Sequence, residues 1–470
     1  MLVARTGLAD VRLDFKFAGV SERYTVTMGV NIDNTNTIVN SVRVHELLSN
    51  EQTIKIGNVP KKVLTIDLVS NDRLLISSNK ASKYYGLMNN TCVIYVYVRE
   101  HGSDIDWSQC AFGKFFVTSW RPKSTTEDNK SVSIEAVDRM GALVKSPIPT
   151  LSLYKGYTLE WYVNSVCGYI SDRSEDELKF GVNLPLGKYN TASDMCLKAN
   201  NVGELLNDVS LSSMNFIIFD RENDLKSIYY NTSAETADVK AKLTDKDVVI
   251  SGILDTSKSM YSKLSVKFSG TTVSDERVIC SVTDYAIKTS ADNSSYTTVN
   301  FPNLSGAVYK VSGVKLRYLN EDVSDVEVRD VYYDRNSVTV RLLNWSSNVQ
   351  SVDIEVIGQI IEEYELEDVF TIGDGETTLN VNNKLGNVGT VTTYGEELCE
   401  VLKNRTESLE LTGSFNVQLK PGDIIEVELE TLDVHGLFMI MDASWTFDGG
   451  VSCVLKLDSI KEIDSDNNEV

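Results

Sequence analysis

Apolar and polar residues alternate one by one near the start of the chain, and this pattern constrains the fold more than any other feature. Val11, Leu13 and Phe15 share one side, while charged residues occupy the positions between them. A period of two is typical of a strand with one buried face. Further runs that are rich in β-branched and aromatic residues follow up to residue 137. We therefore expect a mostly antiparallel sheet over residues 1–150.

The spacing of the apolar residues changes to three and four after residue 149. Residues 158–170 and 192–211 both follow this helical period, and residues 215–230 return to alternation around a turn. The pattern predicts a small α/β unit over residues 151–245, in which a hairpin packs on helices.

Strand patterns then continue almost to the end of the chain. Two alternating runs meet at a turn over residues 334–337, which is typical of a β-sandwich or barrel, and we expect an inserted immunoglobulin-like module within a second β region at 246–365. One helix is predicted over residues 391–403, inside an acidic C-terminal β domain at 366–462. Residues 463–470 are polar and predict a frayed tail. The predicted fold class is mainly β with a small α/β unit, built from several antiparallel barrel or sandwich domains.

Composition limits the protein class. The length of 470 residues predicts several domains, and 42% hydrophobic with 24% charged residues is typical of a globular protein. We expect no membrane insertion, because no apolar run approaches the roughly 20 residues of a bilayer span. Charged residues interrupt the first 17 positions, so we expect no secretion signal and folding in a cytoplasm. The seven cysteines form no Cys-x-x-Cys pair, which predicts reduced, mostly buried thiols.

The net charge of −22 is concentrated in the last quarter of the chain. From Glu362 onward there are 24 acidic residues and 6 basic ones. A protein that grips a phosphate backbone needs the opposite sign, because cations displace the condensed counterions of the nucleic acid. The sequence therefore disfavours tight binding of nucleic acid, but it does not disfavour passage of nucleic acid past the protein.

No sequence motif predicts a catalytic, metal or cofactor site. His45, His101 and His435 are isolated, and no nucleophile elbow, phosphate loop or calcium loop is present. Paired carboxylates for glycoside hydrolysis stay open as an alternative, since the two acids can come from distant strands. The tryptophans are interpreted as packing residues, with a glycan-binding groove as the alternative. They are Trp107, Trp120, Trp161, Trp345 and Trp445.

Three stretches, in this order, resemble the central baseplate hub of bacteriophage tails and related contractile particles. The first is GKFFVTSW at 113–120 followed by VSIEAVD at 132–138, which is similar to two strands of the first β domain of hub proteins. The second is the helical unit that ends in a hairpin at 192–230. The third begins with LKPGDIIEV at 419–427 and is similar to the closing module of these proteins.

The resemblance implies two tube domains per subunit, which let a trimer imitate a six-fold ring. Such a hub joins the tail tube to the spike or tip, meets the tape measure protein, and forms part of the channel that DNA crosses without specific binding. It implies a place in the virion tail after assembly in the host cytoplasm. The segment 273–362 is longer than a minimal hub needs, so a distal-tail or receptor-proximal component stays open. Two other functions were weighed: a host-surface adhesin that binds cell-wall glycan through the inserted module, and a wall-degrading tail enzyme.

One acidic strand is a candidate channel surface. Over residues 423–430, Glu426, Glu428 and Glu430 alternate with apolar residues, which places the three carboxylates on one face. The simpler interpretation is a solvated strand face. The functional hypothesis is that these lumen-facing acids repel DNA phosphates and so prevent DNA from adhering during transit.

Overall fold

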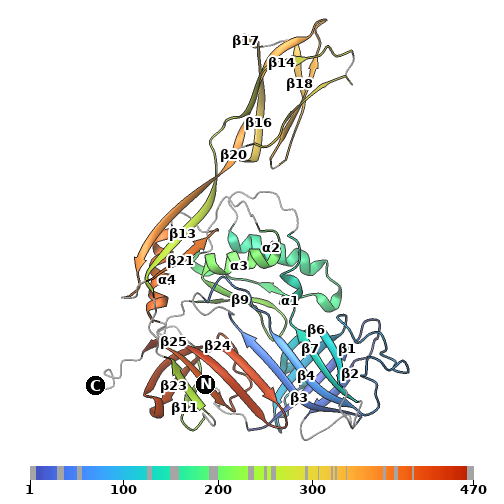
Figure 1. Cartoon of the computed structure of the whole chain (residues 1–470), viewed down its shortest axis with the longest axis vertical. Helices are drawn as coiled ribbons and strands as arrows, with labels where there is room; N and C mark the ends of the chain where they lie inside the picture. The colour runs from blue at the N-terminus through green and yellow to red at the C-terminus, as the bar shows by residue number, and fades with distance from the viewer. Residues whose placement is uncertain are drawn as a thin grey trace.

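The computed structural model is mainly antiparallel β, which confirms the predicted fold class, and it divides into three regions. A large curved sheet lies at one end, helices pack next to it, and a long β arm extends away from both (Figure 1). No described helix is long and apolar enough to cross a membrane. The described residues are 7–28, 36–49, 55–123, 130–148, 158–189, 199–230, 238–247, 251–255, 261–291, 295–304, 306–318, 321–322, 325–334, 336–373, 377–385, 390–404 and 407–462. The predicted tail at 463–470 lies outside them.

The large sheet has 13 strands, which come from residues 9–137, 239–255 and 408–462 of the chain. The order along its main path is β12-β22-β25-β24-β3-β4-β7-β6-β5-β1-β2, with β23 beside β24 and β11 in parallel beside β23. The N-terminal strands are β1 (Ala9–Lys16), β2 (Tyr24–Met28), β3 (Thr37–Leu47), β4 (Val63–Ser70), β5 (Val93–Glu100), β6 (Ala111–Lys123) and β7 (Ser131–Val137). The others are β11 (Val239–Thr244), β12 (Ser251–Asp255), β22 (Ser408–Gly413), β23 (Ile424–Leu429), β24 (Val434–Phe447) and β25 (Val451–Glu462).

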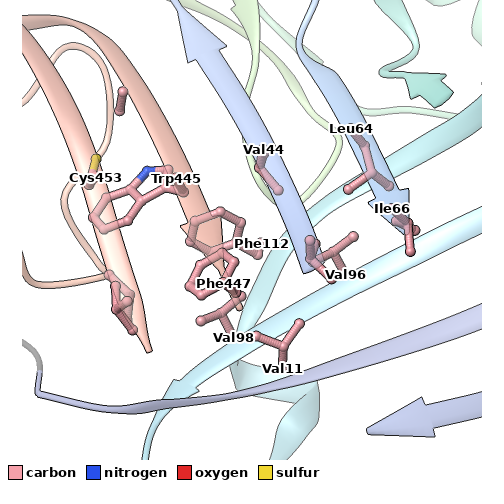
Figure 2. Close-up of a cluster of buried hydrophobic side chains, with 14 of the residues drawn as sticks. Val11, Val44, Leu64, Ile66, Val96, Val98, Phe112, Trp445, Phe447 and Cys453 are labelled. Atoms are coloured by element: carbon pink, nitrogen blue, oxygen red, sulfur yellow. The ribbon is translucent and has the colours of Figure 1, made fainter. Parts of the chain in front are cut away.

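The two halves of this sheet meet where β3 pairs with β24. Val44 lies opposite Trp445, and Val42 lies opposite Phe447. The ring of Phe112 on β6 stands nearly perpendicular to both β24 aromatics, with centroids 6.0 and 5.8 Å away. Figure 2 shows these side chains gathered with apolar residues of the N-terminal strands into one buried cluster. The first and last parts of the chain therefore share one core.

A small α/β unit packs next to this sheet. It contains α1 (Met140–Leu143), α2 (Leu159–Asp172), β8 (Val182–Asn183), α3 (Val202–Ser213), β9 (Asn215–Phe219) and β10 (Leu225–Tyr229). The side chain of Thr158 caps α2, and that of Asn201 caps α3. Of the second predicted helix the structure describes α3, which begins at Val202; residues 190–198 lie outside the described ranges.

One long strand joins the arm to its three-stranded base, which is formed by residues 261–273, 361–371 and 377–383 and which we call the stem. β20 (Gln350–Thr371) pairs in its second half with β13 (Tyr261–Val273), which also pairs with β21 (Thr377–Asn383). In its first half β20 pairs with β14 (Arg277–Ile287) and β16 (Ala307–Tyr318), and β16 pairs with β17 (Glu321–Asp322). A three-stranded sheet of β15 (Thr297–Phe301), β19 (Val338–Asn344) and β18 (Val326–Tyr333) packs on this first half around a core of its own. The arm is thus a two-sheet β structure.

The helix α4 (Val391–Asn404) lies where the sequence predicted a helix, over residues 391–403, and it packs against the stem. The Tyr394 hydroxyl donates to the backbone carbonyl of Leu211 at 2.7 Å, so α4 also contacts the α/β unit. A Cβ atom at Gly395 would lie 2.0 Å from the ring of Phe370 on β20, so this close approach requires glycine.

A buried ion network lies under the junction of the two halves. Glu46 on β3 is fully buried, and it accepts hydrogen bonds from Lys62 at 2.9 Å and from Arg221 at 2.6 Å. Arg221 also donates to the carbonyls of Val417 and Leu419 at 2.6 and 2.8 Å. Burial alone would raise the pKa of Glu46, but the two cations lower it to about 2. The carboxylate is therefore charged and paired, and it joins three regions of the chain.

We expect Arg221→Met to destabilise the protein strongly. The change leaves two backbone carbonyls without their donor and removes one of the two cations that compensate the buried carboxylate, which costs about 3–5 kcal/mol. Urea unfolding followed by tryptophan fluorescence measures this loss. The control is Arg121→Met, whose side chain is 69% exposed, with an expected change within about 0.5 kcal/mol. Equal effects of the two changes would contradict a central role for the network.

Asp138 carries a second buried carboxyl near this network. Its backbone N–H donates to the carbonyl of Lys62, and its Oδ1 accepts from the N–H of Met140 at the start of α1. Its Oδ2 is buried without a hydrogen-bond partner. Burial raises the pKa of Asp138 to about 7, although the charge of Lys62 acts in the opposite direction. The native state therefore favours the protonated acid.

The raised pKa makes stability fall as the pH rises. Between about pH 4 and pH 7 the native state holds a proton that the unfolded chain has lost, so this contribution is fully present below pH 4 and absent above pH 7. We expect Asp138→Asn to exceed the wild type in stability by about 2–4 kcal/mol at pH 8, with the difference vanishing near pH 4. Urea unfolding across this range measures the difference. A difference that does not vary with pH would show that ionisation of Asp138 is not its cause.

Candidate functional site

The described residues contain no cluster of three or more His, Cys, Asp or Glu side chains that could hold a metal ion. His45 lies 2.9 Å from Asp442 across the β3–β24 junction, while His101 lies 3.1 Å from Asp10. These are separate pairs. The six described cysteines are free, and four of them, Cys92, Cys167, Cys399 and Cys453, are buried.

The tryptophans divide into packed and exposed ones. Trp445 is buried, and Trp120 is partly buried and donates to the carbonyl of Leu75 at 3.0 Å. Trp161 and Trp345 expose 41% and 50% of their surface. These two residues are therefore partly accessible to a ligand, and Trp345 belongs to the arm.

The acidic strand has the predicted alternation over most of its length. Glu426 and Glu428 occupy the partly exposed face of β23, and the residues between them are buried. Lys242 of the neighbouring β11 forms salt bridges to both carboxylates, with its Nζ atom 3.0 Å from Glu426. Hydrogen bonds from Lys242 lower the pKa of Glu428, so this carboxylate is charged at neutral pH.

Glu430 differs from the prediction. β23 ends at Leu429, and Glu430 begins a 3-10 helix (Glu430–Leu432) in which its backbone N–H donates to Asp245. The chain bends there because the side chain of Asp245 offers an acceptor that the strand ladder does not. The predicted row of three glutamates is therefore a pair on the strand followed by one exposed glutamate in a turn. Lys242 reduces the negative charge of this face but does not cancel it.

Three strands of the large sheet have a described strand on one side only: β2, β11 and β12. The β2 end bends back toward β3, where the Tyr24 hydroxyl lies 2.6 Å from Thr37. A cavity of about 420 Å³ opens between these strands. Leu8 and Ile38 line it and expose 48% and 46% of their surface, while Ile253 on β12 exposes 59%. Strands with one open edge beside exposed apolar side chains are suited to pairing with another chain, which would bury both.

No known protein family and no curated protein sequence matches the chain. Solved structures do match. The 43 kDa tail protein of prophage MuSo2 from Shewanella oneidensis aligns over 96% of this chain and 98% of its own, with 11% identity and a TM-score of 0.50. The tail protein from Neisseria meningitidis MC58 aligns over 96% of each chain, with 10% identity and a TM-score of 0.50. The chain therefore has the fold of phage tail proteins, as the resemblance predicted.

Proposed function

We propose that the chain is a structural subunit of a phage or phage-like tail, and that it forms the ring of a baseplate or tail-tip hub between the tail tube and the spike or tip. One observation carries the proposal. Two curved β units join edge to edge in one sheet through β3 and β24, and β2, β11 and β12 of that sheet each have a described strand on one side only. The β3–β24 pairing within one chain is thus a model for the edge-to-edge contact that a ring would repeat between chains.

A trimer is the number of subunits that the resemblance to hub proteins implies, and the two β units of each chain support it. Each chain supplies two β units, so three chains supply six and can match a six-fold tail tube. Closure also covers the strand edges and the exposed Leu8, Ile38 and Ile253. The partners of a trimer in this position are the tail tube, the spike or tip and the tape measure protein. The location is the virion tail after assembly in the host cytoplasm, and the role is structural, without catalysis.

We expect Ile253→Lys to prevent ring formation and to leave the fold of the chain intact. The side chain is exposed on the edge strand β12, so the charge costs little in one chain but is costly once a neighbour buries it. Light scattering of the isolated wild type should give three times the 52.3 kDa chain mass, and the variant should give one chain mass.

A matched control for this variant lies on the arm. Val278→Lys places the same charge at an apolar side chain that is 46% exposed on β14, a strand of the arm that lies away from the large sheet (Figure 1), and should leave the trimer intact. A monomeric wild type inside the assembled particle would refute the ring.

The lumen hypothesis belongs to this proposed ring. Glu426 and Glu428 lie on β23, next to the edge strand β11, and Glu430 follows them; in the described part of the chain, Lys242 is the cation that forms salt bridges to two of these three carboxylates. A channel wall with excess negative charge would repel DNA phosphates and keep attractive phosphate contacts from forming. The salt bridges to Lys242 hold the two strand carboxylates in place on that wall.

We expect Glu426→Gln, Glu428→Gln and Glu430→Gln together to slow DNA delivery at low salt and to leave assembly unchanged. The change leaves Lys242 unpaired, so the wall would attract phosphate, and added salt would restore the rate. The rate of DNA release from assembled particles measures this effect. The control changes Glu362, Glu365 and Glu367 on β20 to Gln, which should not alter delivery. Normal delivery by the first variant, or carboxylates that face outward in an image of the ring, would remove the hypothesis.

A further inference from the structure

Exposed aromatic side chains concentrate on the arm. Eight aromatic residues in the described part of the chain expose more than two fifths of their surface, and five of them lie on the arm. The arm points away from the large sheet and the helices, so no described element of the chain covers it (Figure 1). The five are Tyr296, Tyr318, Tyr332, Tyr333 and Trp345.

Three of these residues lie on one surface, the outer face of the three-stranded sheet β15-β19-β18. Val338, Val340 and Leu342 of β19 are fully buried, so the residues between them point outward. The strand registers place two neighbours beside each outward residue. Thr339 lies between Asn300 and Tyr332, and Arg341 lies between Thr298 and Asp330. The same alternation places Leu343, Trp345, Glu327 and Tyr296 on this face. We call these residues the arm face.

Arg341 holds the centre of the arm face. Its guanidinium lies 4.5 Å from the ring centre of Tyr296 and 5.0 Å from that of Tyr332. It also lies 3.9 Å from the carboxylate of Asp330. A planar cation between two rings fixes their positions before any ligand arrives, so a partner would not have to order them.

The edges of the arm face are fixed in the same way. The Trp345 indole donates to Glu327 at 3.2 Å, and the Thr339 hydroxyl donates to the side-chain oxygen of Asn300 at 2.9 Å, which leaves the amide donors of Asn300 available. From Thr339 on β19 to Trp345, which directly follows the end of the strand, the outward positions span roughly 20 Å. The surface is thus a preformed strip of aromatic rings with hydroxyl and amide groups between them.

We propose that the arm face binds a neutral polysaccharide. The aromatic rings can stack on the C–H faces of sugar rings, and the side chains of Thr298, Asn300 and Thr339 can exchange hydrogen bonds with sugar hydroxyls. The strip is long enough for several sugar units.

The charges and the composition of the arm face favour this ligand over two others. Arg341 lies 3.9 Å from Asp330 and against two rings, and Glu327 adds a second negative charge, so even with the exposed Arg329 beside Asp330 the arm face has no excess of positive charge that would favour a phosphate-bearing polymer. Its one aliphatic residue, Leu343, is only 1% exposed, so the surface lacks the apolar centre that a protein interface needs. Because the arm lies away from the large sheet, binding here does not depend on ring formation.

The test uses the full-length chain on immobilised neutral oligosaccharides built from glucose, galactose, rhamnose, N-acetylglucosamine and N-acetylgalactosamine, with polyglycerol phosphate as the anionic probe. The wild type should bind at least one neutral probe. Tyr296→Ala with Tyr332→Ala should weaken that binding by about tenfold or more, because both stacking surfaces are lost. Tyr332→Phe keeps the ring and should keep most of the affinity.

A matched control comes from the other sheet of the arm. Tyr318 on β16 is 51% exposed, as Tyr332 is, but it lies off the arm face, so Tyr318→Ala should leave binding unchanged. Thermal melting of each variant verifies folding. Three results would overturn the proposal: no binding to any neutral probe, binding to polyglycerol phosphate alone, or equal losses in Tyr318→Ala and the double variant. Capture of a purified tail protein through the same tyrosines, without sugar binding, would replace the glycan with a protein partner.

Discussion

The pairing of β3 with β24 is the constraint on which the rest of the structure depends. It joins residues about 400 positions apart, so closing this long loop has a large entropic cost. The side chains that are buried at the contact must offset that cost. The aromatic cluster around Trp445 and Phe447 supplies the apolar burial, and Glu46 supplies a buried charge that is stable only when both cations reach it. Because Arg221 comes from the α/β unit, the junction and the position of that unit are fixed together.

The region around the same junction also brings together parts of the three sequence stretches that resemble hub proteins. Asp138 is the last residue of the VSIEAVD stretch, and its carboxyl accepts a hydrogen bond from Met140, the first residue of α1. Leu419 in the LKPGDIIEV stretch accepts a hydrogen bond from Arg221. Gly422 in that stretch has a φ of 94°, and a Cβ atom there would lie 2.5 Å from Ile228 on β10. All three stretches therefore meet around one buried region, and each is constrained by the other two.

Local patterns predicted the elements well and their partners poorly. Period-two alternation identified the strands because each has one buried face, and the helices α2 and α4 were predicted from their apolar spacing. Nothing in the sequence near Val44 indicates Trp445 as its neighbour, since pairing over such a distance leaves no local signal. Arg221 lies in an acidic turn that resembles solvated surface, yet it is buried. Glu430 does not continue the predicted row of glutamates, because its backbone N–H donates to Asp245, which lies 185 residues away in the sequence.

The continuity of β20 determines what the arm can do. One strand pairs with β13 in the stem and with β14 and β16 in the arm. At Gly358 a Cβ atom would lie 2.3 Å from the carbonyl of Lys310, so the paired strands β16 and β20 approach too closely for a side chain at this position. An arm built this way continues the stem as a spacer, unlike a module on a polar linker. In the proposed trimer, three arm faces would stand at fixed separations. A polysaccharide with repeated units could then engage more than one face at once, and a weak contact at each face would add up to firm attachment without any further contact area.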